Sequence, residues 1–142
     1  MKENKATAEW LGSLKEGKGT FSTGSGAISE ANYNFGSRFA NELGTNPEEM
    51  IAAAHAACFS MAVSAELGKL EVVPNSVKTV AIVSLDLSGD APTVKSSHLE
   101  VEGDVPEGAE DKFRQAAETA KKGCPISRLL NAEITLDVKV VS

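Results

Sequence analysis

The chain has 142 residues, which suits one domain (residues 1–142) whose core is large enough to fold without disulfides or a bound metal. Its net charge of −6, with acidic and basic residues interspersed, argues against a nucleic-acid or anionic-membrane partner and favours a small neutral or apolar one. Residues 1 to 15 carry charge but no apolar run, and no stretch reaches transmembrane length without a polar interruption, so we expect a cytoplasmic protein without a signal peptide.

The segment from Lys5 to Phe39 mixes short β-prone pieces with Gly and Asn turn signals. This pattern predicts three short antiparallel strands. We expect these strands at Ala6–Leu11, Gly19–Thr23 and Tyr33–Phe39, before a polar connector formed by Asn41–Thr45.

A long helix is expected from Pro47 to Leu67, and the rest of the chain is organised around it. Asn46 is a strong N-cap residue, Pro47 suits the first helical position, and Glu49 completes a capping-box-like pattern. Gly68 is expected to supply a left-handed stop. Small side chains occur on every face of this helix rather than along one stripe, so we expect it to be packed on all sides.

After this helix the sequence pattern predicts a hairpin, two helices and a final strand. This order of elements is typical of an α+β fold rather than a doubly wound α/β fold. The expected elements, in chain order, are a strand over Val77–Leu87, a turn at Asp90–Pro92, a strand over Thr93–Glu102, helices over Pro106–Lys122 and Pro125–Leu130, and a strand over Ile134–Val140.

The two cysteines are the first candidates for reactive residues. Cys58 sits near the middle of the apolar helix, where an inert small hydrophobe and a reactive thiol are both consistent with the pattern. Cys124 lies between a helix-ending Gly123 and a helix-starting Pro125 and is expected at a helix N-cap, where free backbone N–H groups favour a thiolate. Such a thiol is a good resolving or leaving group in disulfide exchange.

Three further side chains are candidates for the same site. His55 falls one helical turn before Cys58 and has the spacing of a base for it, although a hydrogen-bonded core histidine is the commoner arrangement. Glu48 is an acid without a capping role and Arg38 stands in a β-like run, but each alone is more often a solvated surface charge. The cysteines, with only His55 and His98 to assist, do not match zinc-ligand spacing, so we expect no metal site.

Two sequence motifs are each centred on a cysteine, Ala53–Ser60 and Lys121–Ser127. Together with Arg38, Gly44–Glu49 and the closing Ala132–Leu136, they resemble the osmotically inducible protein C (OsmC) family of bacterial peroxidases, and the similarity runs nearly end to end. The His-Ala-Ala-Cys-Phe form of the first motif is closer to OsmC proper than to the organic hydroperoxide resistance (Ohr) branch.

The resemblance implies an OsmC-like fold, with antiparallel sheets wrapped around the long helix, and a thiol peroxidase acting on organic hydroperoxides. By the same resemblance, Cys58 is the peroxidatic cysteine, Cys124 the resolving cysteine, and Arg38 and Glu48 the polar pair beside the reactive sulfur. No cofactor is implied. Oxidised Cys58 would form a disulfide with Cys124, and an external dithiol of the lipoyl type would reduce it.

The spacing of Glu48 and Cys58 predicts a homodimer if both residues serve one site. Ten residues on one helix separate them by about 15 Å along the helix axis, which a Glu side chain cannot span. Glu48 would then come from the partner chain of an intertwined two-fold dimer, with each site built from both subunits.

Two other functions are also consistent with the sequence. The first is an apolar-ligand-binding protein with non-catalytic cysteines, which predicts no thiol loss on treatment with peroxide. The second is a thiol hydrolase that uses Cys58 with His55, which predicts an acyl-enzyme and no need for Cys124.

Overall fold

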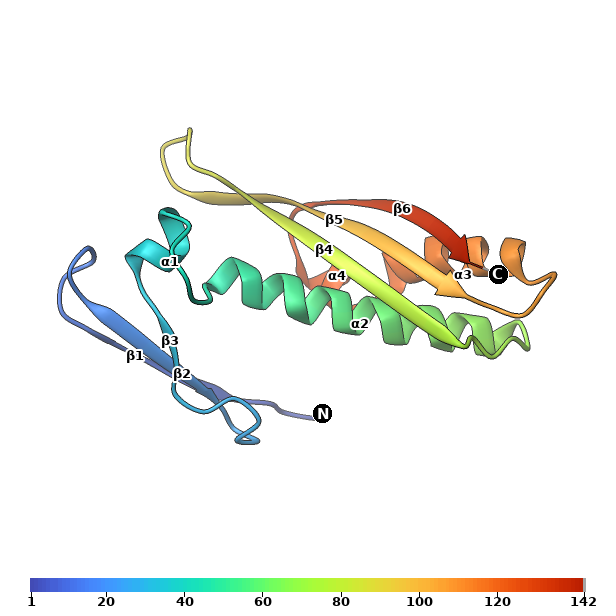
Figure 1. Ribbon diagram of the computed structural model, residues 1–142, viewed down its shortest axis with the longest axis horizontal. Coiled ribbons are helices and arrows are strands. Elements are labelled where there is room, and N and C mark those ends of the chain that lie inside the picture. The colour runs from blue at the N-terminus through green and yellow to red at the C-terminus, as the bar shows by residue number, and fades with distance from the viewer. Residues whose placement is uncertain (142) are drawn as a thin grey trace. The chain divides into compact units, whose positions relative to one another are not determined.

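The computed structural model describes residues 1–141, which form two compact units. The first unit spans Met1–Met50 and the second begins at Ile51. Each unit contains a three-stranded sheet, and one long helix carries the chain from the first unit into the second (Figure 1). The α+β class expected from the sequence is therefore confirmed, whereas a single domain over residues 1–142 stays a prediction.

The sheet of the first unit is antiparallel and has the strand order β1-β2-β3. Its strands are β1 (Ala6–Leu11), β2 (Lys18–Thr23) and β3 (Ala31–Tyr33). The first two strands lie where the sequence predicts them. The third, expected over Tyr33–Phe39, was placed wrongly, because Tyr33 is its last residue rather than its first.

Residues Phe35–Phe39 form a short helix, α1, instead of a strand. Asn34 caps it in a capping box, since the Ser37 N–H donates to Asn34 Oδ1 at 2.8 Å and the Asn34 N–H donates to Ser37 Oγ at 3.0 Å. The two aromatic residues of this segment favour a strand by propensity, but the local cap decides the outcome.

The long helix α2 spans Pro47–Lys69, as the sequence predicts. The Glu49 N–H donates to Asn46 Oδ1 at 2.8 Å, which confirms Asn46 as the N-cap. The expected stop at Gly68 is wrong, because the helix continues through Lys69 and the left-handed residue is Glu71, with φ of 59°. Helix α2 is long and apolar enough to span a membrane by length and composition alone, so the expectation that no stretch reaches transmembrane length is wrong by this criterion.

Within this chain, α2 buries one stripe rather than every face. The buried residues follow at intervals of four, which places them on one side of the helix: His55, Phe59, Val63 and Leu67. The opposite side is open, and Met61 on it is 77% exposed. The expectation of packing on all sides is therefore not met by the residues described.

The second sheet has the strand order β4-β5-β6. Strands β4 (Ser76–Asp86) and β5 (Thr93–Asp104) form the predicted antiparallel hairpin, and β6 (Glu133–Val141) pairs with β5 in parallel. The expectation of purely antiparallel sheets is wrong for this last pair. The two helices between β5 and β6 form a crossover that returns the chain to the same end of the sheet, so the strands run in one direction.

The crossover contains α3 (Glu110–Gly123) and α4 (Pro125–Leu129). Helix α3 begins later than the predicted Pro106, because Gly108 adopts φ of +86° and the Ala109 N–H donates to the Pro106 carbonyl in a turn. Figure 1 shows α2 and α3 along the second sheet, and their buried residues join β5 in one core. This core comprises Phe59, Val63, Leu67, Leu99, Val101, Phe113, Ala116, Ala117 and Ala120, among others.

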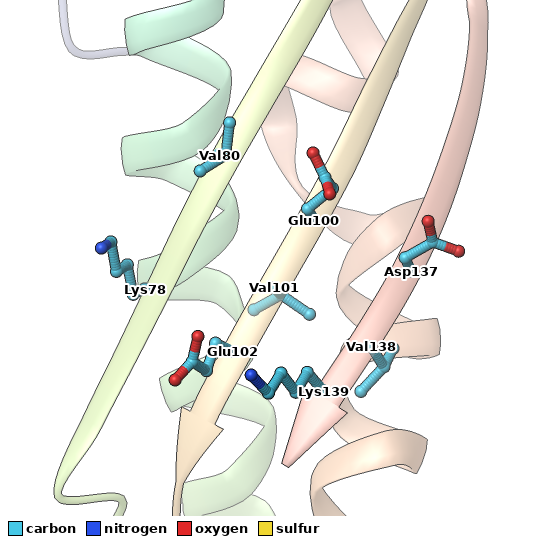
Figure 2. Close-up of a pocket in the computed structure, with 8 residues that line it drawn as sticks. All are labelled: Lys78, Val80, Glu100, Val101, Glu102, Asp137, Val138 and Lys139. Carbon is cyan, nitrogen blue, oxygen red and sulfur yellow. The ribbon is translucent and has the colours of Figure 1, made fainter. Parts of the chain in front are cut away.

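The outer face of the second sheet carries charged side chains in register. Figure 2 shows Lys78, Glu102 and Lys139 from β4, β5 and β6 along one row, where neighbouring charges have opposite sign. Opposite charges on adjacent strands stabilise a sheet modestly. The shallow groove of about 260 Å³ between these side chains contains neither cysteine, and we interpret it as a solvated sheet face.

Candidate active site

The structure brings the two cysteines together although 66 positions separate them in the chain. Cys58 lies near the middle of α2 and Cys124 lies between α3 and α4. The Cys124 thiol donates a hydrogen bond to Cys58 Sγ at an S–S distance of 2.9 Å, and both residues are free thiols. Cys58 is partly exposed, whereas Cys124 is completely buried, so solvent reaches one residue of the pair.

Helix α4 brings a second group to the Cys58 sulfur. Cys124 is the N-cap residue of α4 and Pro125 occupies its first turn, as the sequence predicts. The Cys124 side chain makes no capping hydrogen bond and is directed to Cys58 instead. Two residues later, the backbone N–H of Ile126 donates to the Cys58 sulfur. The first turn of α4 therefore contacts the thiol through a side chain and through the backbone.

The surroundings of Cys58 within the second unit favour its protonated form. Burial raises the pKa of the Cys58 thiol, and the hydrogen bond and charge interaction with Cys124 raise it further. The Ile126 N–H lowers this pKa but does not outweigh the other two effects. Since the thiolate is the nucleophilic form of cysteine, a reactive Cys58 needs an additional positive group.

His55 is completely buried one turn before Cys58, and both of its ring nitrogens have partners. Nδ1 lies 2.7 Å from Ser97 Oγ of β5, and Nε2 lies 2.8 Å from Ser127 Oγ of α4. Burial lowers the pKa of His55, so the ring is neutral near pH 7. The bond to each serine leaves neither nitrogen free to act as a base for Cys58, which argues against the hydrolase expected as one alternative.

Sequence reasoning did not identify Ser97 and Ser127. One sign of Ser97 was available: it shares the inward face of β5 with Leu99 and Val101, and a polar residue in such a row needs a buried partner. Ser127 lies in the second cysteine motif, but nothing local shows that its hydroxyl faces a histidine 72 positions earlier in the chain.

Arg38 and Glu48 form an ion pair in the first unit. Arg38 Nη2 lies 2.6 Å from Glu48 Oε1, and Arg38 Nε lies 3.1 Å from Glu48 Oε2, which is a two-point contact. Burial alone would raise the pKa of Glu48, but the hydrogen bonds and the charge of Arg38, with a backbone hydrogen bond, lower it overall. The Glu48 side chain is 12% exposed and that of Arg38 is 36% exposed, so the guanidinium can meet a ligand.

An apolar cleft of about 430 Å³ lies beside Arg38 in the first unit. The Arg38 guanidinium also stacks over the Phe39 ring, 5.1 Å from its centroid. The cleft is lined by aromatic and other residues: Trp10, Gly12, Leu14, Tyr33, Asn34, Phe35, Arg38 and Phe39. Arg38 and the cysteines lie in different units, so the placement of Arg38 and Glu48 beside the reactive sulfur stays a prediction.

The part of the chain that the structure describes contains no cluster of side chains that could bind a metal ion. Among residues 1–141, no three or more His, Cys, Asp or Glu side chains lie close enough together to hold a metal ion. His98 lies on β5, where its ring bonds to Thr135 and its Nε2 lies 3.1 Å from Asp137 Oδ2. Phe59, the neighbour of Cys58 in the motif, is completely buried in the core.

Comparisons with known proteins agree with the resemblance seen in the sequence. The family model described as OsmC-like protein matches residues 40–139. Peroxiredoxin OsmC of Escherichia coli (strain K12) is 47% identical over 138 residues, which cover 97% of this chain and 96% of the relative, and that of Shigella flexneri is equally similar.

Solved structures share the fold at lower identity. An OsmC-like protein of unknown function from Vibrio cholerae gives a TM-score of 0.78 at 16% identity, over 97% of this chain and 99% of that one. The organic hydroperoxide resistance protein OhrB of Bacillus subtilis gives a TM-score of 0.70 at 21% identity, over 96% and 98% of the two chains. These matches confirm the expected OsmC-like fold of the chain.

Proposed function

The chain belongs to the OsmC family, and on this premise we propose that it is a thiol peroxidase that reduces organic hydroperoxides to alcohols. Its relatives at 47% identity are named peroxiredoxin OsmC, which supports a peroxidase. The observation that carries the proposal is the 2.9 Å approach of the two sulfurs, of which Cys58 is partly exposed and Cys124 buried. A buried second thiol in contact with a solvent-accessible one suits a resolving cysteine.

In the first step, the Cys58 thiolate attacks the distal oxygen of the hydroperoxide. The O–O bond breaks as an S–O bond forms, and the leaving alkoxide takes a proton from solvent to become the alcohol. Cys58 is oxidised to a sulfenic acid, and the hydroperoxide is reduced by two electrons.

In the second step, the Cys124 thiol condenses with the Cys58 sulfenic acid. The S–S bond forms, the S–O bond breaks, and water leaves. A disulfide has an S–S length of about 2.05 Å, so the sulfurs must approach by about 0.9 Å from their separation of 2.9 Å.

The activating cation is proposed to be Arg38, held by Glu48, from a second subunit. The groups that act on Cys58 within residues 51–141 raise its pKa in sum, although the Ile126 N–H lowers it, so the thiolate needs a positive neighbour from elsewhere. Glu48 and Cys58 stand ten positions apart on the continuous helix α2, or about 15 Å along its axis. A two-fold homodimer with antiparallel α2 helices would supply each Cys58 with the Arg38–Glu48 pair of the other chain.

The open side of α2 supports such a dimer. Its exposed residues at helical spacing include Met61 and four small ones that allow two helices to approach closely: Ala54, Ala57, Ala65 and Gly68. A partner helix on this side would complete the packing expected from the sequence.

The proposed substrate follows from the cleft beside Arg38, and the proposed reductant follows from the exposure of Cys58. An apolar tail of the hydroperoxide would occupy the aromatic cleft beside Arg38. An external dithiol of the lipoyl type would then attack the disulfide at Cys58, because Cys124 is completely buried and inaccessible to it. Two thiols that cycle through a disulfide need a reducing compartment, so we place the protein in the cytoplasm.

A thiol titration before and after one equivalent of cumene hydroperoxide tests the proposal. We expect the wild type to lose two thiols per chain, and Cys124→Ser to lose one while still producing one equivalent of alcohol. Excess peroxide should convert Cys58 of Cys124→Ser to sulfinic acid, detected by mass. Cys58→Ser should produce no alcohol.

Two outcomes would contradict the proposal. No thiol loss in the wild type would favour an apolar-ligand-binding protein. Equal loss of the first turnover in Cys58→Ser and Cys124→Ser would refute the assignment of roles to the two cysteines.

A further inference from the structure

We propose that His55 and Ser127 are positioning residues for the resolving step: the bond between them holds the Cys124–Ser127 turn against Cys58. This inference rests on the proposed thiol peroxidase function. It concerns two residues that take no part in the chemistry described above and that touch neither the sulfur atoms nor the substrate in that scheme.

The first argument is the position of the bond. His55 and Cys58 lie one turn apart on α2, and Ser127 and Ile126 are consecutive residues in the first turn of α4. Ser127 Oγ lies 2.8 Å from His55 Nε2, while the Ile126 N–H donates to the Cys58 sulfur. One polar bond therefore fixes α4 to α2 directly beside the redox pair.

The second argument is that few other polar contacts join these two helices. Among the described residues, the hydrogen bonds that join two side chains between α2 and the Cys124–Leu129 segment are the His55–Ser127 bond and the contact between the two cysteines, and the Ile126 N–H adds a contact to the Cys58 sulfur. Both contacts to the Cys58 sulfur involve the atom that reacts, and they change when Cys58 becomes a sulfenic acid, because the sulfur then carries an oxygen. The His55–Ser127 bond does not involve the reacting sulfur, so it can hold α4 against α2 through both steps.

The third argument concerns the other nitrogen of the ring. His55 Nδ1 bonds to Ser97 of β5 at 2.7 Å, and β5 carries no cysteine. Both serines are buried, and both bonds involve a hydroxyl and the same neutral ring. The chain thus offers a matched control, in which an equivalent bond can be removed on the side away from α4.

The consequence is a specific kinetic effect. Condensation requires the sulfurs to approach by about 0.9 Å, and a loosened α4 would reduce the time that Cys124 spends in position. Misplacement of a reacting group by about 1 Å can slow a step by as much as 100-fold, so we expect disulfide formation to slow by roughly tenfold or more. The preceding attack on peroxide would change less, because Cys58 itself stays on α2.

The test measures both steps in Ser127→Ala and Ser97→Ala. Single-turnover mixing with cumene hydroperoxide, quenched with a thiol-alkylating reagent, gives the rates of alcohol release and of disulfide formation. We expect Ser127→Ala to release alcohol at nearly the wild-type rate, to form the disulfide roughly tenfold more slowly, and to accumulate Cys58 sulfinic acid in excess peroxide. Ser97→Ala should form the disulfide at the wild-type rate, and Ser127→Thr, which keeps the hydroxyl, should recover it.

A second pair of variants addresses the same bonds from the histidine, in case Ser127→Ala does not fold. The amide of Asn can take the place of Nδ1 and the longer Gln amide that of Nε2. His55→Asn should therefore keep the Ser97 bond and form the disulfide slowly, whereas His55→Gln should keep the Ser127 bond and form it at close to the wild-type rate.

Equal rates of disulfide formation in Ser127→Ala and Ser97→Ala, or in His55→Asn and His55→Gln, would overturn the inference. The wild type separates this result from failure of the proposed function. If the wild type loses two thiols per chain, the peroxidase proposal stands whatever the variants do.

Discussion

The proposed sharing of Glu48 between subunits predicts that two impaired variants restore activity to each other. Cys58→Ser lacks the nucleophile, and Glu48→Ala leaves Arg38 without the carboxylate that lies 2.6 Å from its guanidinium. Loss of that orientation should lower kcat/KM by about 100-fold. A heterodimer of the two variants combines Cys58 of the Glu48→Ala chain with Glu48 of the Cys58→Ser chain in one complete site.

The expected recovery has a definite size. Random refolding of an equal mixture makes about half of the dimers heterodimers, and each of these has one complete site out of two, so activity per chain should reach about one quarter of wild type. If Glu48 served its own chain, every site would carry one defect and no recovery would occur. The argument depends on the separation of about 15 Å between positions 48 and 58 along the continuous helix α2.

The assay follows peroxide consumption with a dithiol reductant after refolding the mixture from denaturant. Different affinity tags on the two chains isolate the heterodimer, and each variant refolded alone is the control. A verified heterodimer with no more activity than Glu48→Ala, or a wild-type protein that sediments as a monomer at micromolar concentration, would show that the site is not shared.

Three further predictions follow from the structure. Organic hydroperoxides with bulky apolar tails should have higher kcat/KM than hydrogen peroxide, because each methylene buried in the aromatic cleft contributes about 0.8 kcal/mol, and a ratio of one or below would contradict this. The lowered pKa of Glu48 predicts that Glu48→Gln destabilises the fold most at pH values above the usual pKa of 4.5. This destabilisation should disappear as the pH falls through the lowered pKa, because the native carboxylate is then protonated. Urea unfolding at several pH values measures it, and a loss of stability that does not depend on pH would refute the ion-pair assignment. Gly103→Ala should destabilise the fold by about 1 to 3 kcal/mol in urea unfolding, because a Cβ there would overlap the buried Phe113 ring, whereas Gly123→Ala, which meets no neighbour, should change stability by no more than about 0.5 kcal/mol.

The parts of the fold that depend on local signals were predictable from the sequence. The start of α2 follows from Asn46 and Pro47, whose capping roles act within three residues, and the β4–β5 hairpin follows from strict alternation around a turn. Phe35–Phe39 shows the limit, because its aromatic residues favour a strand while the cap at Asn34 favours a helix. Propensity and capping then conflict, and the hydrogen bonds of the cap prevailed.

The parts that depend on distant contacts were not predictable from pattern alone. Whether β6 runs parallel or antiparallel to β5 depends on the path of the α3–α4 crossover, which no residue of β6 reveals. The pairing of Cys58 with Cys124 came from a family resemblance, since 66 positions separate them. Ser97 and Ser127 were missed for the same reason, because their common partner His55 lies 42 and 72 positions away.

The chemistry of the site links assembly to reactivity in the proposed enzyme. Burial and Cys124 raise the pKa of Cys58 within the second unit, so a chain without its partner would hold a protonated, slowly reacting thiol. Each unit by which a docked Arg38 lowers this pKa increases the thiolate fraction about tenfold, as long as the pKa stays above the ambient pH. An unassembled chain would therefore also resist irreversible oxidation of Cys58, which proceeds through the thiolate.

This link makes a prediction that needs no peroxide. In Cys124→Ser, which leaves one reactive thiol, the rate constant for alkylation of Cys58 by iodoacetamide at fixed pH should fall as dilution dissociates the dimer, with sedimentation at the same concentrations to verify dissociation. Glu48→Ala, added to the same background, should start from the slower rate and respond less to dilution, because its Arg38 is not held in place. A rate constant that does not change across a verified dissociation would mean that Cys58 is activated within its own chain, and the argument for a shared Arg38 would then lose its electrostatic basis.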